Sequence, residues 1–444
     1  MPRSARTIPP LTFCVMGFGW LVLASIVGMA TLVGLVHSTP LPAWVRALHV
    51  HAVLVGGIAQ IILGGFLLLI PQPNSANRKD ADSHPFTFWA MNGGLIGMLM
   101  GFWLHRYLVI GVAGFVVIAA FFLSSTRFGY MRTLPGGSQS KSLGITRSPS
   151  SALWTDRPAE KSWRSGTFRN PMATCASRTF THLVVIGFVV LVIIGMLHQL
   201  LPAVWNRPLV SPTLARIGTI LIPIGVTVLI GGFLNSSIPI ELTGGAVLFI
   251  GGILWTGSLF RTWLSSTLTG SAASDHLFVS AFFFIFTIIL GVLVGANNLG
   301  DHPVLSYGRL HLVAYTHMAF IGFVMNAIMG AFSYLIPIIL ATDRISSHKK
   351  RGRYLDRLTS MMNRWSTVQI ATLNLGTMGL GILAALTWNV PLTSIYILVA
   401  SWTSLSLLMT GLTLFSVKLT SIIAKKPDQL RTGQISTDEL KLTA

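Results

Sequence analysis

The chain has little charge: Asp, Glu, Lys and Arg together make up 10% of its residues. Water-soluble proteins carry charge on about a quarter of their residues, because their surfaces must stay hydrated. With 52% hydrophobic residues and a mean hydropathy of +0.70, the composition excludes an ordinary soluble protein and indicates a polytopic membrane protein. Cysteine is also scarce, and the two that occur, Cys14 and Cys175, exclude a disulfide-rich scaffold.

Eleven apolar stretches are long enough to cross a membrane, since about 20 apolar residues span about 30 Å of hydrocarbon as a helix. We expect these spans at residues 12–36, 50–70, 86–104, 107–123, 183–204, 217–234, 242–260, 277–296, 312–340, 368–388 and 391–417. The first stretch is longer than the apolar part of a usual cleavable signal peptide, so we expect it to remain as a span.

One pattern occurs three times with identical spacing: a histidine, a glycine five residues later, a glycine eight residues after that, and a proline seven residues further. The three copies are His51, Gly56, Gly64, Pro71; His182, Gly187, Gly195, Pro202; and His317, Gly322, Gly330, Pro337. Their histidines are 131 and 135 residues apart, which predicts three related units. We therefore expect an all-α polytopic membrane protein, a pseudo-threefold bundle of three repeats with about four helices each.

The basic residues favour twelve crossings, although eleven spans are clear. If the amino terminus is inside, the outer side holds only Arg46, Arg106 and Arg309, with residues 125–178 left out. Lys and Arg are enriched in cytoplasmic loops, so this split predicts that both termini are cytoplasmic, in the cell (inner) membrane. The net charge of +19 is then explained without nucleic acid. The expected parts are repeats at 1–124, 179–262 and 276–417, a basic stretch at 125–178 and a cytoplasmic tail at 418–444.

The stretch 125–178 replaces a helix that the second repeat should contain. Six charged residues between Arg147 and Arg164 exclude a span there, because each central charge costs about 2.5–3.5 kcal/mol. Three alternatives stand: a basic cytoplasmic linker, a buried re-entrant segment, or an out-of-frame replacement of a lost helix. We favour the last, because the motif spacing is preserved across a stretch that turns rich in Ser, Arg and Pro. If resequencing finds no nearby frame correction that restores an apolar span, this hypothesis fails.

The motif residues suit a metal-bearing bundle. A histidine near the start of a helix offers the nitrogen that most often ligates haem iron or copper. The glycines allow close approach of a helix or a flat macrocycle, and the proline is expected at the far end of the span. Without a Cys-x-x-Cys-His run, any haem would be noncovalent. The nearby His49 and His311 would reach the same ligand only if the helix begins between each of them and its motif histidine.

Other polar residues receive simpler interpretations. We expect a hydrogen-bonded packing role for His198, with a proton or metal relay as the alternative. The clusters at Lys349–Arg351 and Lys425–Lys426 are expected to orient the chain and attract anionic lipid. Solvated positions at span ends are expected for Glu241, Asp275, His276, Asp301 and His302.

The sequences Leu48-His-Val-His-Ala-Val-Leu-Val-Gly-Gly57 and Tyr315-Thr-His-Met-Ala-Phe-Ile-Gly322, with four crossings per repeat, resemble subunit I of the haem-copper oxidases and nitric oxide reductases. They resemble the shorter NnrS-like haem-copper membrane proteins equally. The resemblance covers the chain outside 125–178 and the tail.

The resemblance implies that His51 and His317 are the axial ligands of a low-spin b-type haem near the outer surface, beside Gly56 and Gly322. It also implies that His182 is a copper ligand, and His49 and His311 are further candidates for metal ligation. The adjacent histidine pair that oxidases place on their seventh helix is absent, because residues 217–234 contain no histidine. One haem and one further metal ligand therefore match better than a complete oxygen-reducing centre.

Three functions follow from these features. The first is a haem-binding membrane protein concerned with nitric oxide, oxygen or copper handling or with electron transfer. The second is the catalytic subunit of a respiratory terminal oxidase or nitric oxide reductase, an oxidoreductase that takes its missing ligands from a partner. The third is a transporter, for which helices broken at midmembrane by Gly or Pro would be expected. Expected partners are membrane lipid and another respiratory subunit or electron donor.

Overall fold

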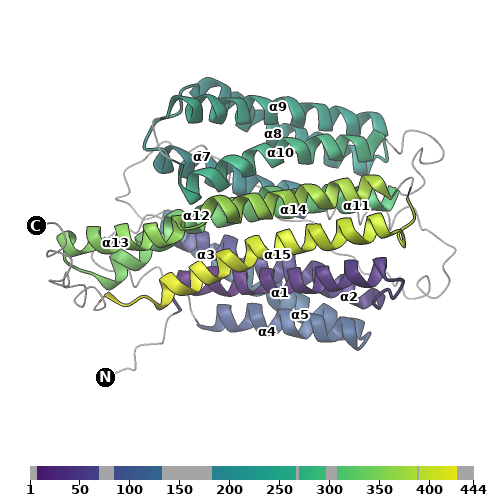
Figure 1. Ribbon diagram of the computed structural model, residues 1–444, viewed down its shortest axis with the longest axis horizontal. Helices are drawn as coiled ribbons and strands as arrows, with labels where there is room; N and C mark the ends of the chain where they lie inside the picture. Colours follow the sequence, from purple (N-terminus) through teal and green to yellow (C-terminus); the bar gives the residue numbers. More distant parts are fainter. Residues whose placement is uncertain are drawn as a thin grey trace, which may run out of the picture. The chain divides into compact units, whose positions relative to one another are not determined.

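The computed structural model describes residues 8–69, 85–132, 183–266, 270–296, 308–387 and 390–427, and their regular elements are helices (Figure 1). The chain forms two compact units. Unit 1 contains Met1–Gly28 and Pro42–Ser177, and unit 2 contains Met29–Leu41 and Arg178–Ala444. Helix α1 (Pro10–Val36) contributes residues to both units.

Unit 1 is built around the helix that carries the first motif histidine. This helix consists of α2 (Ala43–His51), η1 (Ala52–Ala59) and α3 (Gln60–Leu69) without interruption. The pair α4 (Pro85–Trp103) and α5 (Tyr107–Arg132) follows, joined by a short turn. Phe13 of α1, Leu63 of α3 and Met91 of α4 lie together in a core from which water is excluded. In a membrane, the van der Waals contacts of such closely packed side chains help to hold the helices together.

Unit 2 contains the remaining helices. They are η3 (Leu183–Val190), α7 (Leu191–Val204), α8 (Pro212–Leu234), α9 (Ile238–Ser265), α10 (Ala272–Ala296), α11 (Gly308–His317), η4 (Met318–Met325), α12 (Asn326–Arg344), α13 (His348–Asn363), α14 (Ser366–Leu386) and α15 (Ile395–Ala424). The continuous helix α11, η4 and α12 is central, because 83% of its apolar window is buried, compared with 28–39% for the other candidate spans of this unit.

Helices α8 and α9 show how small residues bring membrane helices together (Figure 1). Gly218, Gly225 and Gly232 recur every seven residues on α8 and face Trp255, Leu248 and Glu241 of α9 in antiparallel order. A Cβ atom on any of these glycines would lie 2.7–2.8 Å from the backbone nitrogen of the facing residue. The stripe therefore lets the two backbones approach closely, as is common in membrane bundles.

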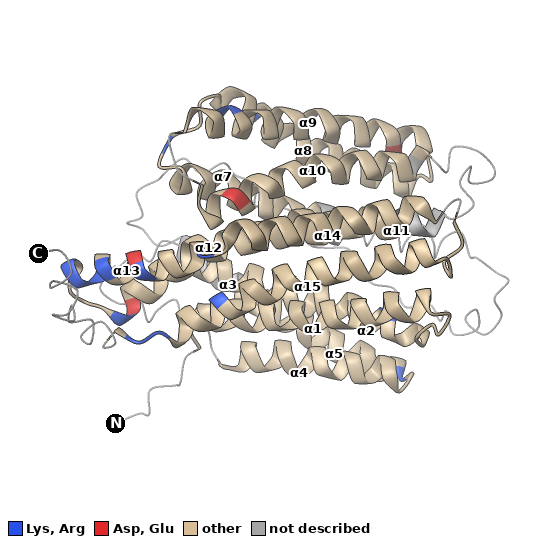
Figure 2. Ribbon diagram, in the orientation of Figure 1, with Lys and Arg blue, Asp and Glu red and all other residues tan. Residues whose placement is uncertain are grey.

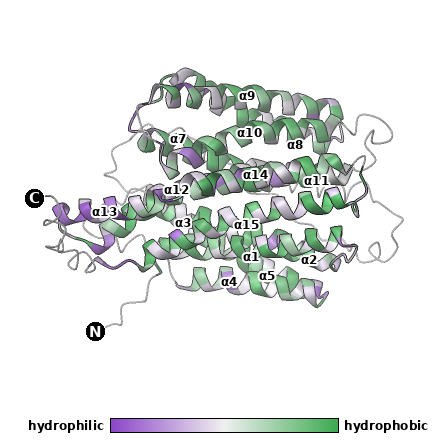
Figure 3. Cartoon of the chain, viewed as in Figure 1, coloured by the Kyte–Doolittle hydropathy of each residue, from purple (hydrophilic) through white to green (hydrophobic). Residues whose placement is uncertain are grey.

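All eleven stretches that we expected to span are helical. Ten helices of the described ranges are long and apolar enough to cross a membrane, and Figure 3 shows their apolar character. The remaining stretch forms α4, whose polar Asn92 and flanking tryptophans lower its mean hydropathy. The class of protein is thus a polytopic helical membrane protein. Residues 125–178 lie almost wholly outside the described residues, since α5 extends to Arg132 and the description resumes at Leu183.

Local expectations for the motif had different outcomes. Pro202 lies in the last turn of α7, at the far end of its span as expected, whereas Pro337 lies inside α12, which continues to Arg344. Contrary to expectation, His51 and His317 do not stand at helix starts, because α2 begins at Ala43 and α11 at Gly308. The basic segment after Arg344 forms a helix of its own, α13, on which Lys and Arg gather (Figure 2).

Candidate functional site

His51 ends α2, directly before the π-helix η1. Its Nδ1–H donates a hydrogen bond to the carbonyl oxygen of Ala47, four residues earlier, over 2.8 Å. Its ring centroid lies 4.6 Å from that of Phe102. Because a carbonyl oxygen can only accept, the ring proton is at Nδ1. The lone pair of the neutral imidazole is then at Nε2, the arrangement in which a histidine commonly ligates a metal.

His317 has the same local arrangement in unit 2. Its Nδ1–H donates to the carbonyl oxygen of Val313, also four residues earlier, over 2.7 Å. The proton is again at Nδ1 and the lone pair at Nε2. His51 and His317 belong to different units, so their pairing across one haem stays a prediction.

A π-helix of eight residues follows the position of each motif histidine. These are η1 (Ala52–Ala59), η3 (Leu183–Val190) and η4 (Met318–Met325), and each begins at the residue after the histidine. π-helical turns are rare in proteins and are frequent at functional sites. His182 itself lies outside the described residues, so its role as a copper ligand stays a prediction.

The first glycine of the motif faces side chains of neighbouring helices. A Cβ atom on Gly56 would lie 2.7 Å from Leu95 of α4 and 2.8 Å from Trp20 of α1. A Cβ atom on Gly322 would fall on the ring of Phe283 of α10. Of the two interpretations of these glycines, the contacts support close helix packing. A role beside a cofactor stays a prediction.

The accessory histidines do not share the position of the motif histidines. Both His49 and His51 lie within α2, so the helix does not begin between them. The Nδ1–H of His49 donates to the carbonyl oxygen of Ala24 on α1 over 2.9 Å. His311 lies in α11 together with His317, and the side chain of His311 is outside the description. Metal ligation by His49 and His311 stays a prediction.

Within the described ranges, no group of three or more His, Cys, Asp and Glu side chains comes together as a metal site would require. His182 lies outside those ranges. His198 was expected to pack through hydrogen bonds, but its Nδ1 is buried and has no hydrogen-bond partner in the described part of the chain. Asp301 and His302 also lie outside the description.

The sequence-based expectation for His276 was wrong. It is fully buried in α10, although we expected a solvated position at the end of a span. Its Nδ1 lies 2.7 Å from Oδ1 of Asn326 on α12, and its Nε2 lies 2.7 Å from Nε2 of Gln369 on α14. The side chains of Asn326 and Gln369 are fully buried as well. Polar side chains inside the membrane are costly and usually functional, and this signal was present in the sequence as polar residues within apolar runs.

The polar chain continues on both sides of His276. On one side, Nζ of Lys418 on α15 lies 2.6 Å from Oε1 of Gln369. On the other, Nδ2 of Asn326 donates to Oδ1 of Asn374 over 2.8 Å and to the carbonyl oxygen of Gly322 over 2.8 Å. This series of hydrogen bonds therefore reaches a carbonyl of η4, the π-helix that follows His317.

A related amide pair exists in unit 1. Gln60 and Asn92 are both buried, and Nε2 of Gln60 donates to Oδ1 of Asn92 over 3.0 Å. Nε1 of Trp20 donates to the same oxygen over 2.9 Å. Gln60 follows His51 by nine residues, and Asn326 follows His317 by nine residues. The first residue after η1 and the first residue after η4 thus each carry a buried amide that bonds an asparagine of another helix.

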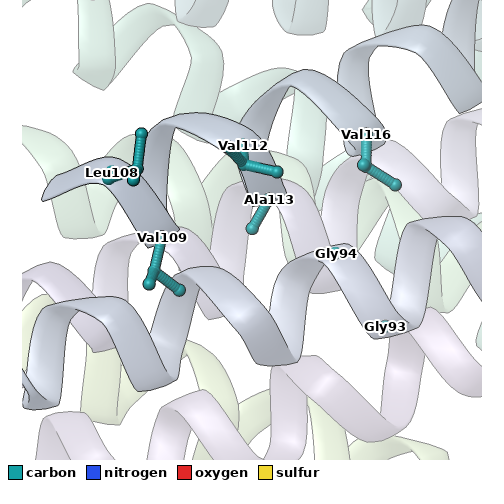
Figure 4. Close-up of a pocket in the computed structure, with 7 residues that line it drawn as sticks. All are labelled: Gly93, Gly94, Leu108, Val109, Val112, Ala113 and Val116. Carbon is teal, nitrogen blue, oxygen red and sulfur yellow. The ribbon is translucent and has the colours of Figure 1, made fainter. Parts of the chain in front are cut away.

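An apolar groove of about 450 Å³ lies on α4 and α5 (Figure 4). Its walls are Gly93 and Gly94 of α4 and Leu108, Val109, Val112, Ala113 and Val116 of α5. None of these side chains could orient a polar substrate, because all of them are hydrocarbon or glycine. Leu108 and Val112 are largely exposed, as is expected of residues that face lipid chains.

No protein-family model matches the chain, and no curated protein matches it either. The fold and the site residues define its class as a polytopic helical membrane protein with histidines inside its spans. The family resemblance of the histidine motifs stays a prediction.

Proposed function

We propose that this protein is a haem-binding integral membrane protein of the haem-copper oxidase-like or NnrS-like kind. In this proposal His51 and His317 are the axial ligands of one noncovalent b-type haem, and the protein takes part in electron transfer or in handling nitric oxide, oxygen or copper. The observation that carries the proposal is the shared geometry of the two histidines: each holds its proton at Nδ1 through the carbonyl four residues earlier.

This geometry fits haem ligation. An axial histidine coordinates iron through Nε2, and its Nδ1–H is commonly held by a backbone carbonyl, which fixes the ring orientation and raises the basicity of the ligand. A bound haem would supply reversible one-electron chemistry. The residues of this chain would hold the macrocycle between apolar helices and keep water from the iron.

The proposal includes a threefold repeat of about four helices per unit. The recurring π-helix at the same motif position supports it, because π-helices are rare in proteins and three of them are not expected at matching positions in unrelated segments. The buried amide nine residues after His51 and after His317 supports it as well. In the second copy of the motif, the residue nine positions after the histidine is Leu191, so the amide pair is confined to the first and third copies.

A reduced-minus-oxidised spectrum of the purified protein tests the ligand assignment. We expect a six-coordinate low-spin spectrum in the wild type. Either His51→Ala or His317→Ala should abolish it, because each removes one axial ligand. The matched control is His105→Ala, since His105 is an exposed residue in the turn between α4 and α5 and should leave the spectrum unchanged. A low-spin spectrum that survives either ligand substitution would refute the pairing.

A further inference from the structure

Lys418 is an amine within α15, a candidate membrane span that continues past residue 417, where we expected the cytoplasmic tail to begin. It lies in α15 with only 9% of its surface exposed. Nζ donates to the carbonyl oxygen of Met362 over 3.0 Å and to Oε1 of Gln369 over 2.6 Å. Both acceptors are neutral oxygen atoms. A charged side chain in such a position is a functional-site hypothesis by default.

The hydrogen bonds that join Lys418, Gln369, His276 and Asn326 all run in one direction, each residue donating to the next. Oε1 of Gln369 accepts from Lys418, so the amide nitrogen of Gln369 faces His276 and donates to its Nε2. Asn326 uses its amide nitrogen for Gly322 and Asn374, so its oxygen accepts from Nδ1–H of His276. His276 is therefore neutral, with its proton at Nδ1, when Lys418 donates to Gln369.

We propose that Lys418, Gln369 and His276 form a binding site for a single proton, which is held by either the amine of Lys418 or the imidazole of His276. The amide of Gln369 sets which of them holds it. In the observed orientation Lys418 is the donor and His276 the acceptor. If the amide turns over, Oε1 faces His276 and accepts from a protonated Nε2, while the amide nitrogen donates to the lone pair of a neutral Lys418.

Both arrangements satisfy the surrounding groups. Met362 accepts from Lys418 in each, and Asn326 accepts from Nδ1–H of His276 in each. Each arrangement also carries one positive charge, so the exchange moves a proton between two positions without a counter-ion.

Two protons cannot be held. The amide has one oxygen, so one of the two charged donors would face its N–H groups, and a buried donor without an acceptor is strongly unfavourable.

Three side chains from three helices surround the ring of His276. Asn326 of α12, Gln369 of α14 and the ring of Phe415 of α15 contact it, the last with centroids 6.3 Å apart. Besides His276 itself, Lys418 is the titratable residue of the hydrogen-bonded series. The neighbouring acidic residue in the sequence is Asp275, which precedes His276 on α10. The site does not depend on haem binding, because it involves none of the proposed ligands.

Nitrogen-15 NMR of protein labelled at histidine in lipid bilayers tests the site. The signal of His276 is assigned as the one lost in His276→Gln, and His348→Gln, which removes an exposed histidine of α13, is the matched control. In the wild type we expect a neutral imidazole with the proton at Nδ1 from about pH 8 down to about pH 5, the range in which an ordinary histidine becomes charged. A neutral imidazole with its single proton at Nε2 would overturn the proposal in the wild type alone, because Nδ1–H donates to Asn326 in both arrangements.

Two variants test the sharing of the proton. In Lys418→Met the imidazole should become charged within that pH range, because the positive charge of Lys418 no longer opposes it and Oε1 of Gln369 is free to turn toward Nε2. In Gln369→Glu, a carboxylate can accept from both sides, so His276 should be charged at neutral pH while Lys418 stays charged. A neutral His276 in both variants would overturn the proposal.

Discussion

At the residue scale, three histidines of the spans are held by specific partners. His51 and His317 use one ring nitrogen to bind their own helices, and His276 uses both of its ring nitrogens between α12 and α14. In a medium without water, each such bond replaces a hydration partner that the group would otherwise lose, at a cost of about 1–3 kcal/mol. The orientation of these rings is therefore built into the helices that surround them.

The second glycine of the motif offers a test of packing at a single residue. Gly330 faces Leu277, and a Cβ atom would lie 2.6 Å from Cγ and 3.1 Å from the backbone nitrogen of that residue. We expect Gly330→Ala to destabilise the protein by about 1–3 kcal/mol, because the backbone of α10 cannot move aside without loss of packing. Thermal unfolding in detergent measures the effect.

Gly195 is the matched control, since it holds the same motif position in α7 and a Cβ atom there would meet nothing within 4 Å. Gly195→Ala should leave the unfolding temperature unchanged or raise it, because alanine favours a helix by about 1 kcal/mol over glycine. Equal losses in both variants would contradict this account of the motif.

The sequence could predict some of the candidate site and not the rest. The histidine spacing led to His51 and His317, because a period along one chain is visible without coordinates. The partners of His276 are 50 and 93 residues away, and those of Lys418 are 49 and 56 residues away. Contacts of this kind depend on how helices pack, so the burial of His276 near the start of α10 was not predicted.

At the element scale, long apolar runs in the sequence predict the membrane-spanning helices. The segments that connect these helices are harder to predict. The amphipathic helix α13 was not predicted, because its exposed face is basic and its mean hydropathy is low. Its buried residues Tyr354, Leu358 and Met362 recur every four positions, which is the helical signal that the charges obscured.

Arg344 ties three of these helices together. From the end of α12 its guanidinium donates to the carbonyl oxygens of Lys425 and Ile423, each over 2.7 Å, and to the hydroxyl of Tyr354 on α13 over 3.0 Å. The hydroxyl of Tyr354 in turn donates to the carbonyl of Lys425 over 2.6 Å. A cation at this position satisfies the last carbonyls of α15 and complements the helix dipole.

We expect Arg344→Met to release the end of α15. The loss of the hydrogen bonds should cost about 1–3 kcal/mol, and hydrogen exchange at residues 420–427 should become faster. Mass spectrometry of the exchanged protein measures this. Arg353→Met is the control, because Arg353 is exposed on α13 and its replacement should change stability by no more than about 0.5 kcal/mol. Unchanged exchange in Arg344→Met would show that α15 ends without this support.

At the scale of the whole molecule, the number of crossings decides how the units are related. With twelve crossings, the basic loops before residue 125 and after residue 178 all lie on the inner side of the membrane. With eleven crossings, every loop after residue 178 changes to the opposite side. Leu104 lies exposed in the turn between α4 and α5, and Lys350 lies exposed on α13. The first scheme predicts that they are on opposite sides of the membrane.

Single cysteines at these positions test the scheme in a background without Cys14 and Cys175. In intact cells, Leu104→Cys should react with a membrane-impermeant maleimide and Lys350→Cys should react only after the cells are opened, because Lys and Arg clusters remain cytoplasmic. Reaction of both cysteines in intact cells would support eleven crossings and contradict the twelve-crossing topology.

The central claim is that the histidine motif builds a haem site, and haem content tests it most directly. Pyridine haemochrome analysis of the purified, folded protein should give about one b-type haem per chain, because one pair of axial histidines holds one iron. A well-folded preparation from haem-replete cells that contains no haem would contradict the claim.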